Sequence, residues 1–205
     1  MTFQSVSKLD AATRQLHLAI RLYFQEADPL GFHTLAGAAH RILEDLSRKR
    51  GHGVSLESKG LQVQSGHHAI VMRNIRDAKN FLKHADRDPD AMLTFHPDWT
   101  DFLMMDAIQM HTGLTATIHL PDAIFLIWVS TKYPEVLLLD STIFSSTAAG
   151  LRSVFASLEG SDKKRAFVKA LEKSQVLSES ARPADGKGKP KKPVLKLVPK
   201  PPRPK

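Results

Sequence analysis

The sequence predicts a mainly α protein, a helical bundle of about five to seven helices with one short β element as an alternative and a disordered C-terminal tail. Three observations support this fold class. Apolar residues recur at helical spacing in several segments, residues typical of helix ends flank those segments, and the last part of the chain consists mainly of Pro, Lys and Gly.

The first two predicted helices follow from their end signals. Ser7 and Asp10 have the spacing of a capping box, so the first helix should begin near Ser7. It should end before Asp28 and Pro29, which favour the start of a second helix because aspartate caps free amides and proline is tolerated in the first turn. Basic residues followed by Gly51 should end that helix. The short link predicts an antiparallel helical hairpin.

The middle of the chain is expected to contain a loop and a third helix. Residues 52–66 are rich in glycine and predict a loop, with a short strand at 61–64 as the alternative. The third helix is predicted over 69–85. Residues 86–90 should end it, because they include a proline and residues before proline avoid helical backbone angles.

Two apolar segments predict the fourth and fifth helices. After a short extended piece at 91–96, the fourth helix is expected from about Asp98 to Thr112. Pro121 can open the fifth, which continues toward Tyr133. Because this last segment is hydrophobic nearly all round, we expect it to be central.

Two interpretations remain open for the later segments. Strands at 124–129 and 136–139 are an alternative, since β-branched and aromatic residues are frequent there. Two further short helices are expected at 146–158 and 161–174, separated by Gly160. The domain organisation is therefore a helical domain over 1–177.

The positive charge of the chain lies in its C-terminal end. Residues 182–205 contain nine basic residues and one acidic residue, and the rest of the chain contains 20 of each, so the formal net charge of +8 belongs to the tail. Residues 178–205 have too few apolar residues to offset chain entropy, which predicts a disordered Pro/Lys-rich basic tail. Its charge and its P-x-x-P spacings suit an acidic partner, either protein or nucleic acid.

Composition excludes several classes of protein. The absence of cysteine excludes disulfides, thiolate zinc sites and cysteine nucleophiles. The N-terminal residues do not have the pattern of a secretory signal. The longest apolar run, 123–129, has seven residues, whereas a membrane span needs about 20. We therefore expect a cytoplasmic protein without a membrane span, with a homodimer as one potential assembly.

One set of candidate residues shares a stripe on the second helix. His33, Gly37, His40 and Glu44 are spaced to lie on one side, away from the Leu/Ile face. Two imidazoles and a carboxylate could bind a metal, but the two histidines lie about 10 Å apart along the axis. The spacing favours a polar seam at which another helix approaches closely, and no metal or cofactor is predicted. His33, His40 and Glu44 remain candidate binding residues.

A second set lies at the end of the third helix. Asn80, Lys83 and His84 share one helix face, and Asp86 and Asp88 follow directly. An amide, an ammonium and an imidazole together could bind phosphate or transfer a proton, with His84 as acid/base. The same residues could instead form a surface hydrogen-bond network that ends the helix. Asn80, Lys83 and His84 are the catalytic candidates, and Asp86 and Asp88 are binding candidates.

The other histidines are isolated in the sequence or form only a local pair. A lone histidine is usually an ordinary core or surface residue, so none of these is given a functional role. They include His17, His67, His68, His96, His111 and His119.

Residues 32–40 and 80–89 resemble a recurring pattern in small uncharacterised bacterial helical proteins, a family without an assigned function. More distantly, a helical bundle with an Asn/Lys/His patch at a helix end is similar to HEPN-type domains, many of which are ribonucleases in toxin–antitoxin and defence systems. That resemblance implies a catalytic Arg followed by four to six residues and a His. The pairs Arg76/His84 and Arg48/His52 do not have this spacing, so no catalytic residue is transferred.

Two hypotheses of function follow. The first is a helical binding or regulatory module that uses the surface around His33, His40 and residues 80–84, with the tail holding an acidic partner. The alternative is a HEPN-like ribonuclease or phosphotransfer enzyme in which Lys83 stabilises phosphate charge and His84 transfers a proton. A cleft formed by the two candidate segments would favour a true site.

Overall fold

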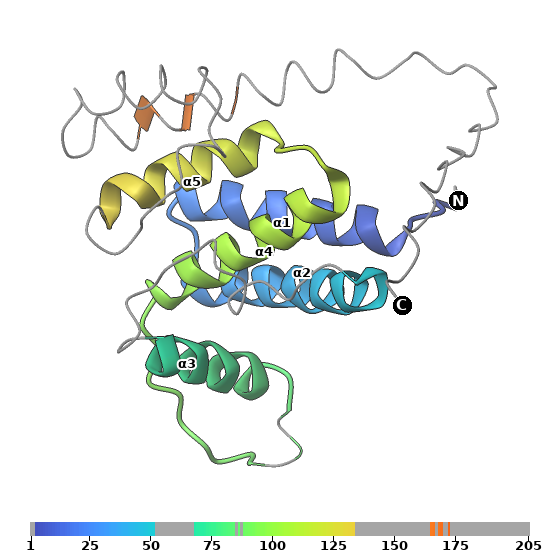
Figure 1. Cartoon of the computed structure of the whole chain (residues 1–205). Helices are drawn as coiled ribbons and strands as arrows, with labels where there is room; N and C mark the ends of the chain where they lie inside the picture. The colour runs from blue at the N-terminus through green and yellow to red at the C-terminus, as the bar shows by residue number, and fades with distance from the viewer. Residues whose placement is uncertain are drawn as a thin grey trace, which may run out of the picture.

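The computed structural model describes residues 3–51, 68–84, 86, 88–133 and five residues between 165 and 172. This part is helical and contains no strand (Figure 1). Its helices are α1 (Lys8–Phe24), α2 (Pro29–Arg50), α3 (His68–Phe81), α4 (Trp99–Thr115) and α5 (Leu120–Lys132). The predictions for 52–66, 136–139, 146–158 and 178–205 lie outside the described residues. Of the segment 161–174, Arg165, Ala166, Val168, Lys169 and Glu172 are helical.

The predicted hairpin and its caps are confirmed in α1 and α2. The Ser7 hydroxyl accepts a hydrogen bond from the Asp10 amide at 3.0 Å, and the Asp10 carboxylate accepts one from the Ser7 amide at 3.4 Å. The Asp28 carboxylate accepts a hydrogen bond from the Leu30 amide at 2.8 Å. Gly51 ends α2 with φ = 72°, a left-handed conformation that glycine adopts without steric cost. The two helices run antiparallel (Figure 1).

The centre of the bundle is α4, which packs against each of the other four helices. The segment after Pro121, which we predicted to be central, forms α5 and buries Ile124 to Ile127 and Val129, while α4 is buried on all of its faces. The reason is that α4 carries Phe102 to Met105 and Ile108 around its whole circumference, together with polar residues that find partners. The strand alternative for 124–129 is wrong, because these residues are helical.

Helix ends differ from the predicted ones by a few residues. α3 stops at Phe81, four residues before the predicted end, and a turn at Leu82 and Lys83 follows it. α4 continues three residues beyond Thr112 and ends before Ala116, whose φ of 53° is left-handed. None of the helices in the described ranges combines the length and the apolar character needed to cross a membrane.

A buried carboxylate joins the start of α4 to the end of α5. Lys132 Nζ donates to Asp101 at 2.7 Å and to Asp98 at 2.8 Å, and the Tyr133 hydroxyl donates to Asp101 at 2.9 Å. Burial raises the pKa of Asp101, and the hydrogen bonds from Lys132 and Tyr133 oppose that rise. Asp101 is fully buried, so these donors replace the water that it loses on folding.

Candidate functional site

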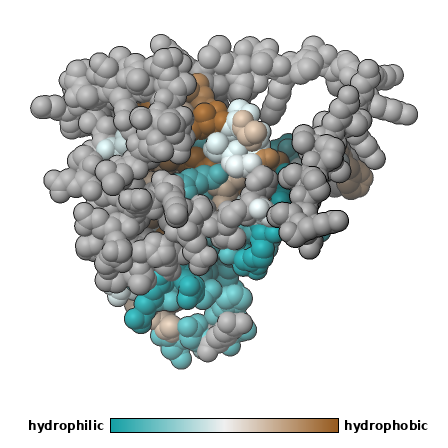
Figure 2. Space-filling view, in the orientation of Figure 1, coloured by the Kyte–Doolittle hydropathy of each residue, from teal (hydrophilic) through white to brown (hydrophobic). Residues whose placement is uncertain are grey.

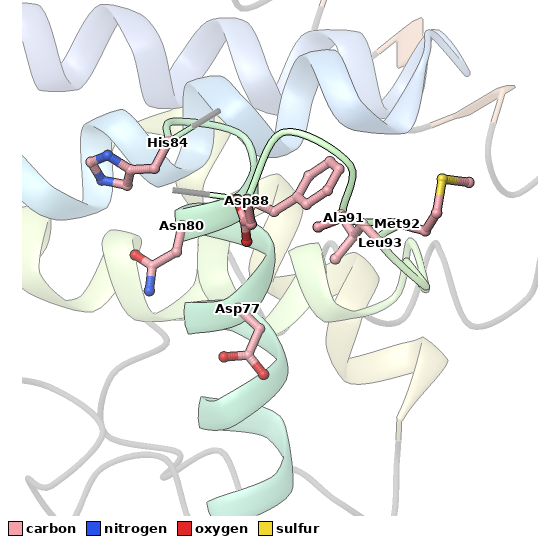
Figure 3. A pocket seen from close by; sticks show the side chains of 8 residues that line it. Asp77, Asn80, His84, Asp88, Ala91, Met92 and Leu93 are labelled. Carbon is pink, nitrogen blue, oxygen red and sulfur yellow. The ribbon is translucent and has the colours of Figure 1, made fainter. Parts of the chain in front are cut away.

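A hollow of about 380 Å³ lies where α3 ends and the chain turns back (Figure 3). α3 supplies Asp77, Asn80 and Phe81 to its lining, and the following segment supplies His84, Asp88 and residues 91–93. Figure 3 shows Asp88 over the end of the helix and residues 91–93 on the loop that passes it. The structure therefore brings Asn80, His84 and Asp88 together, as residues of one hollow.

The lining of this hollow combines acidic and apolar groups. Asp77 and Asp88 are both exposed carboxylates, and Asp77 lies 3.6 Å from the Arg73 guanidinium. Phe81 exposes 36% of its surface and Met92 exposes 94%. Large apolar side chains this exposed are available to a partner.

The other candidates near this hollow lie beside it. Lys83 and Asp86 are exposed and do not belong to the lining. His84 Nδ1 lies 3.9 Å from Asp86 Oδ1, a distance too long for a strong hydrogen bond. Figure 2 shows that the lower part of the molecule, where Figure 1 places α3 and its loop, is mainly hydrophilic. The apolar groups of the hollow thus lie within a polar surface.

The histidines of the α2 stripe lie in the interior, and our prediction that they belong to a binding surface is wrong in this respect. His33 is fully buried: its Nδ1 lies 2.9 Å from the Thr100 hydroxyl, and its ring meets Phe95 edge-on at 5.1 Å between centroids. Burial, and then the charge of Lys79, lower the pKa of His33 to about 4. His33 is therefore neutral at pH 7.

His40 joins three helices through both of its ring nitrogens. Its Nε2 lies 2.6 Å from Asp106 Oδ2 on α4, and its Nδ1 lies 3.3 Å from Lys79 Nζ on α3. An ammonium can only donate, so Nδ1 accepts and the Nε2–H donates to Asp106. A Cβ added at Gly37 would lie 3.2 Å from Lys79 Cγ, which shows how closely α3 approaches α2 here. The stripe is thus a polar seam between helices.

The stripe on α2 meets α3 at Lys79, one helical turn before the predicted Lys83 and His84. Among the described contacts, Lys79 is the residue of α3 that reaches His40, whereas His84 lines the hollow at the helix end. Burial lowers the pKa of Lys79, and the nearby Glu44 raises it. Glu44 itself accepts from Arg48 at 3.0 Å and from Arg41 at 3.2 Å on α2.

A third cluster was missed by the sequence analysis. It combines His17 of α1, His111 near the end of α4 and Asp122 in the first turn of α5, and each residue offers one ligand atom within 4.8 Å of the others. His111 Nδ1 lies 2.9 Å from Asp122 Oδ2, and His17 Nε2 lies 3.2 Å from Asp122 Oδ1. Imidazole and carboxylate are common ligands of divalent transition metals.

The elements around this cluster explain its geometry. The break after α4 and the proline-started α5 bring Asp122 back toward His111, 11 positions earlier in the sequence. Asp122 also lies at the positive end of the α5 dipole. The ring of His119, which precedes α5, has its centroid 4.9 Å from that of His111 and 5.5 Å from that of His17.

The cluster combines one buried carboxylate with three imidazole rings. Burial alone would raise the pKa of Asp122, but the neighbouring His111 and His17 outweigh it and hold this pKa below its usual value. Burial lowers the pKa of His119; Asp122 raises it, and the two other imidazoles lower it further. The neutral imidazole is the form that binds metals.

Comparison of the chain with protein-family models, with curated proteins and with solved structures finds no match. The assignment of a function therefore rests on the geometry of these side chains.

Proposed function

We propose that this chain is a helical binding module that recognises a protein partner in the hollow at the end of α3. The partner segment would present a Lys or Arg next to an apolar side chain. The observation that carries the proposal is the pairing of exposed apolar groups, Phe81 and Met92, with the carboxylates of Asp77 and Asp88 in one hollow.

The two kinds of group would have different roles in binding. Removing Phe81 and Met92 from water supplies affinity, since buried apolar area is the main favourable term in association. Asp77 and Asp88 would orient the cationic group through charge-assisted hydrogen bonds. Asn80 and His84 supply further polar contacts at the same lining.

The basic tail supports the same proposal from the sequence. Residues 182–205 carry the formal net charge of +8, which attracts acidic surfaces over a distance of about one Debye length. Such attraction mainly raises the rate of association and makes it sensitive to salt. In this proposal the tail attracts a partner whose surface is acidic overall. The hollow then gives specificity by binding a segment of that partner with a Lys or Arg next to an apolar side chain.

The ribonuclease alternative is less well supported by the geometry. Asn80 and His84 do share the hollow, but Lys83, proposed to stabilise phosphate charge, does not belong to the lining. Asp77 and Asp88 do, and they would repel a phosphate backbone. Cleavage of mixed RNA by the full chain, lost in His84→Ala, would restore this alternative.

Peptide binding by the full chain tests the proposal. An array of peptides in which a Lys or Arg is placed at varied distance from a Leu should show selective binding, compared with peptides carrying Glu instead. Met92→Asp and Asp88→Lys should each weaken the selected peptides by more than about tenfold, because one removes apolar contact and the other repels the cation. Leu30→Asp changes an apolar residue of similar character, 41% exposed, outside the hollow and should leave binding unchanged.

The outcomes separate the competing explanations. Selection of basic and apolar peptides that survives Met92→Asp and Asp88→Lys would contradict the hollow as the binding site. Binding of labelled RNA in preference to every peptide would contradict a protein partner and favour a nucleic-acid partner.

A further inference from the structure

The polar cluster between α1, α4 and α5 has potential ligand atoms at separations slightly shorter than those around a bound metal ion. Zinc bonds to nitrogen or carboxylate oxygen are about 2.0–2.2 Å long, so neighbouring ligands of a tetrahedral ion lie about 3.3–3.6 Å apart. The separations here are 2.9 Å from His111 Nδ1 to Asp122 Oδ2 and 3.2 Å from His17 Nε2 to Asp122 Oδ1. Small side-chain rotations would admit an ion between them.

The hydrogen bonds of His111 are compatible with a metal ion at this position. The Thr13 hydroxyl donates to the Leu9 carbonyl at 2.9 Å, so toward His111 Nε2, also at 2.9 Å, it can only accept. His111 Nε2 then donates to Thr13, and His111 Nδ1 lies 2.9 Å from Asp122 Oδ2, a carboxylate oxygen that can only accept. Either a proton on Nδ1 or a metal ion between Nδ1 and the carboxylate would satisfy both atoms.

Two buried atoms of the cluster also lack a hydrogen-bond partner among the described residues: His17 Nε2 and Asp122 Oδ1. They lie 3.2 Å from each other, within the distance of an ion pair, and Asp122 is fully buried. Buried polar atoms are rarely left without a partner, and a bound ion is one of the few arrangements that satisfies both.

The surroundings suit a ligand set of nitrogen and oxygen. With Nδ1 on the ion, His111 would donate its Nε2–H to Thr13, the kind of outer hydrogen bond that orients metal-bound histidines. His119 is half-buried and its ring adjoins both other imidazoles, so it could complete four-coordination. The His17 side chain is 16% exposed and gives the site an edge that solvent can reach.

We propose that His17, His111 and Asp122 bind one divalent transition-metal ion of the Zn²⁺ type, and that the adjoining His119 turns its ring to supply a fourth ligand. This site is separate from the hollow at the end of α3, and the proposal does not depend on the proposed function.

Metal titration of the full chain tests this site. After treatment with a chelator, the protein should bind one equivalent of Zn²⁺ in calorimetry and show a rise in thermal midpoint with Zn²⁺. Co²⁺ in its place should give visible absorption bands of a low-coordinate site with nitrogen and oxygen ligands. Absence of a saturable one-to-one site for both ions would overturn the proposal.

Variants locate the site. Asp122→Asn keeps the side-chain shape but removes the charged ligand, and His17→Gln changes the most exposed of the three ligands; each should weaken Zn²⁺ binding by more than about tenfold and abolish the Co²⁺ bands. If Asp122→Asn does not fold, His17→Gln still decides the question. Unchanged affinity in a folded His17→Gln protein would show that the ion, if bound, lies elsewhere.

Two controls exclude other histidines. His96 has a side chain that is 67% exposed, so His96→Gln should leave the one-to-one binding unchanged. The double variant His67→Gln/His68→Gln removes the only pair of adjacent histidines in the sequence and should do the same. Loss of binding in either control with retention in His17→Gln would reject the assigned ligands.

Discussion

At the scale of single residues, the buried histidines of this bundle are held by polar groups from other helices. His33 meets Thr100, His40 meets Asp106 and Lys79, and His111 meets Asp122. Each imidazole loses its contact with water on folding, so each needs such a partner.

His33 should make stability depend on pH in a specific window. Its pKa falls from 6.5 in the unfolded chain to about 4 in the fold, owing first to burial and then to Lys79. The unfolded state therefore binds the proton first, so the stabilisation is complete above about pH 6.5 and is lost as the pH falls toward 4. The loss should reach about 3 kcal/mol. Urea unfolding of the wild type and of His33→Asn between pH 7 and pH 4 measures it.

The comparison isolates His33 from the carboxylates, which also titrate in this range. Asn can still hydrogen-bond to Thr100 but does not take up a proton, so the variant should lose less stability on acidification than the wild type. The matched control is His96→Asn, at an exposed position, whose pH profile should follow the wild type. Parallel profiles for His33→Asn and wild type would show that His33 does not cause the pH dependence.

The long-range partners of these histidines could not be predicted from the sequence. The stripe of His33 and His40 was recognised from helical spacing, but its burial depends on Thr100 and Asp106, which lie more than 60 residues away. His17, 94 residues from His111, was taken as an isolated histidine. No spacing rule connects residues that only the packing of α1 on α4 brings together.

At the scale of helices, local end signals were the reliable predictors. Ser7, Asp28 and Gly51 all act as the sequence indicates, because caps depend on contacts within three residues of the helix end. The end of α3 was predicted four residues too late, since no such signal stands at Phe81. The central place of α4 depends on contacts with four other helices and could not be predicted from one segment.

Asp28 should contribute to stability mainly as a cap. Its carboxylate accepts the Leu30 amide at the start of α2, so Asp28→Ala leaves that donor without its side-chain partner. We expect a loss of about 1 kcal/mol, which corresponds to a fall of about 3–4 °C in the thermal midpoint. Asn caps a helix as well as Asp does, so the thermal midpoint of Asp28→Asn should fall by less than half as much. Equal losses in calorimetry would point to charge and not to capping.

Lys132 should be a larger contributor, because it neutralises a carboxylate that water cannot reach. Lys132→Met would leave Asp101 buried without a cation, with hydrogen bonds to tyrosine hydroxyls such as that of Tyr133. Removing one partner of a buried pair typically costs about 3–5 kcal/mol, and the partial exposure of Lys132 places the expectation near 3 kcal/mol. Chemical unfolding at pH 7 measures this loss.

The control for Lys132 is a matched change to another lysine. Lys8→Met replaces an exposed lysine in the first turn of α1 and should change the free energy of unfolding by less than about 0.5 kcal/mol. A Lys132→Met protein as stable as Lys8→Met would mean that Asp101 is protonated in the fold and needs no cation. The free energy of unfolding would then show no loss on acidification from the pair Lys132 and Asp101.

At the scale of the whole molecule, charge and packing are divided between different parts of the chain. The described core is formed by residues of α1 to α5, with Ala166 and Val168 packed against it. The formal net charge of +8 belongs to residues 182–205, and residues 1–181 have equal numbers of basic and acidic residues. Changes to residues 182–205 should therefore alter the affinity for polyanions without altering the stability of the fold.

Deleting residues 182–205 tests that separation. The shortened chain should keep its thermal midpoint within about 2 °C, because it retains every residue of the described core. The full chain should bind heparin resin and elute with added salt, whereas the shortened chain should not be retained. Replacing the seven lysines of this segment with Gln keeps its length and should abolish retention as well. A shortened chain that melts at a much lower temperature would assign the tail a role in the fold, and one that still binds heparin would reveal a basic face on the helical domain.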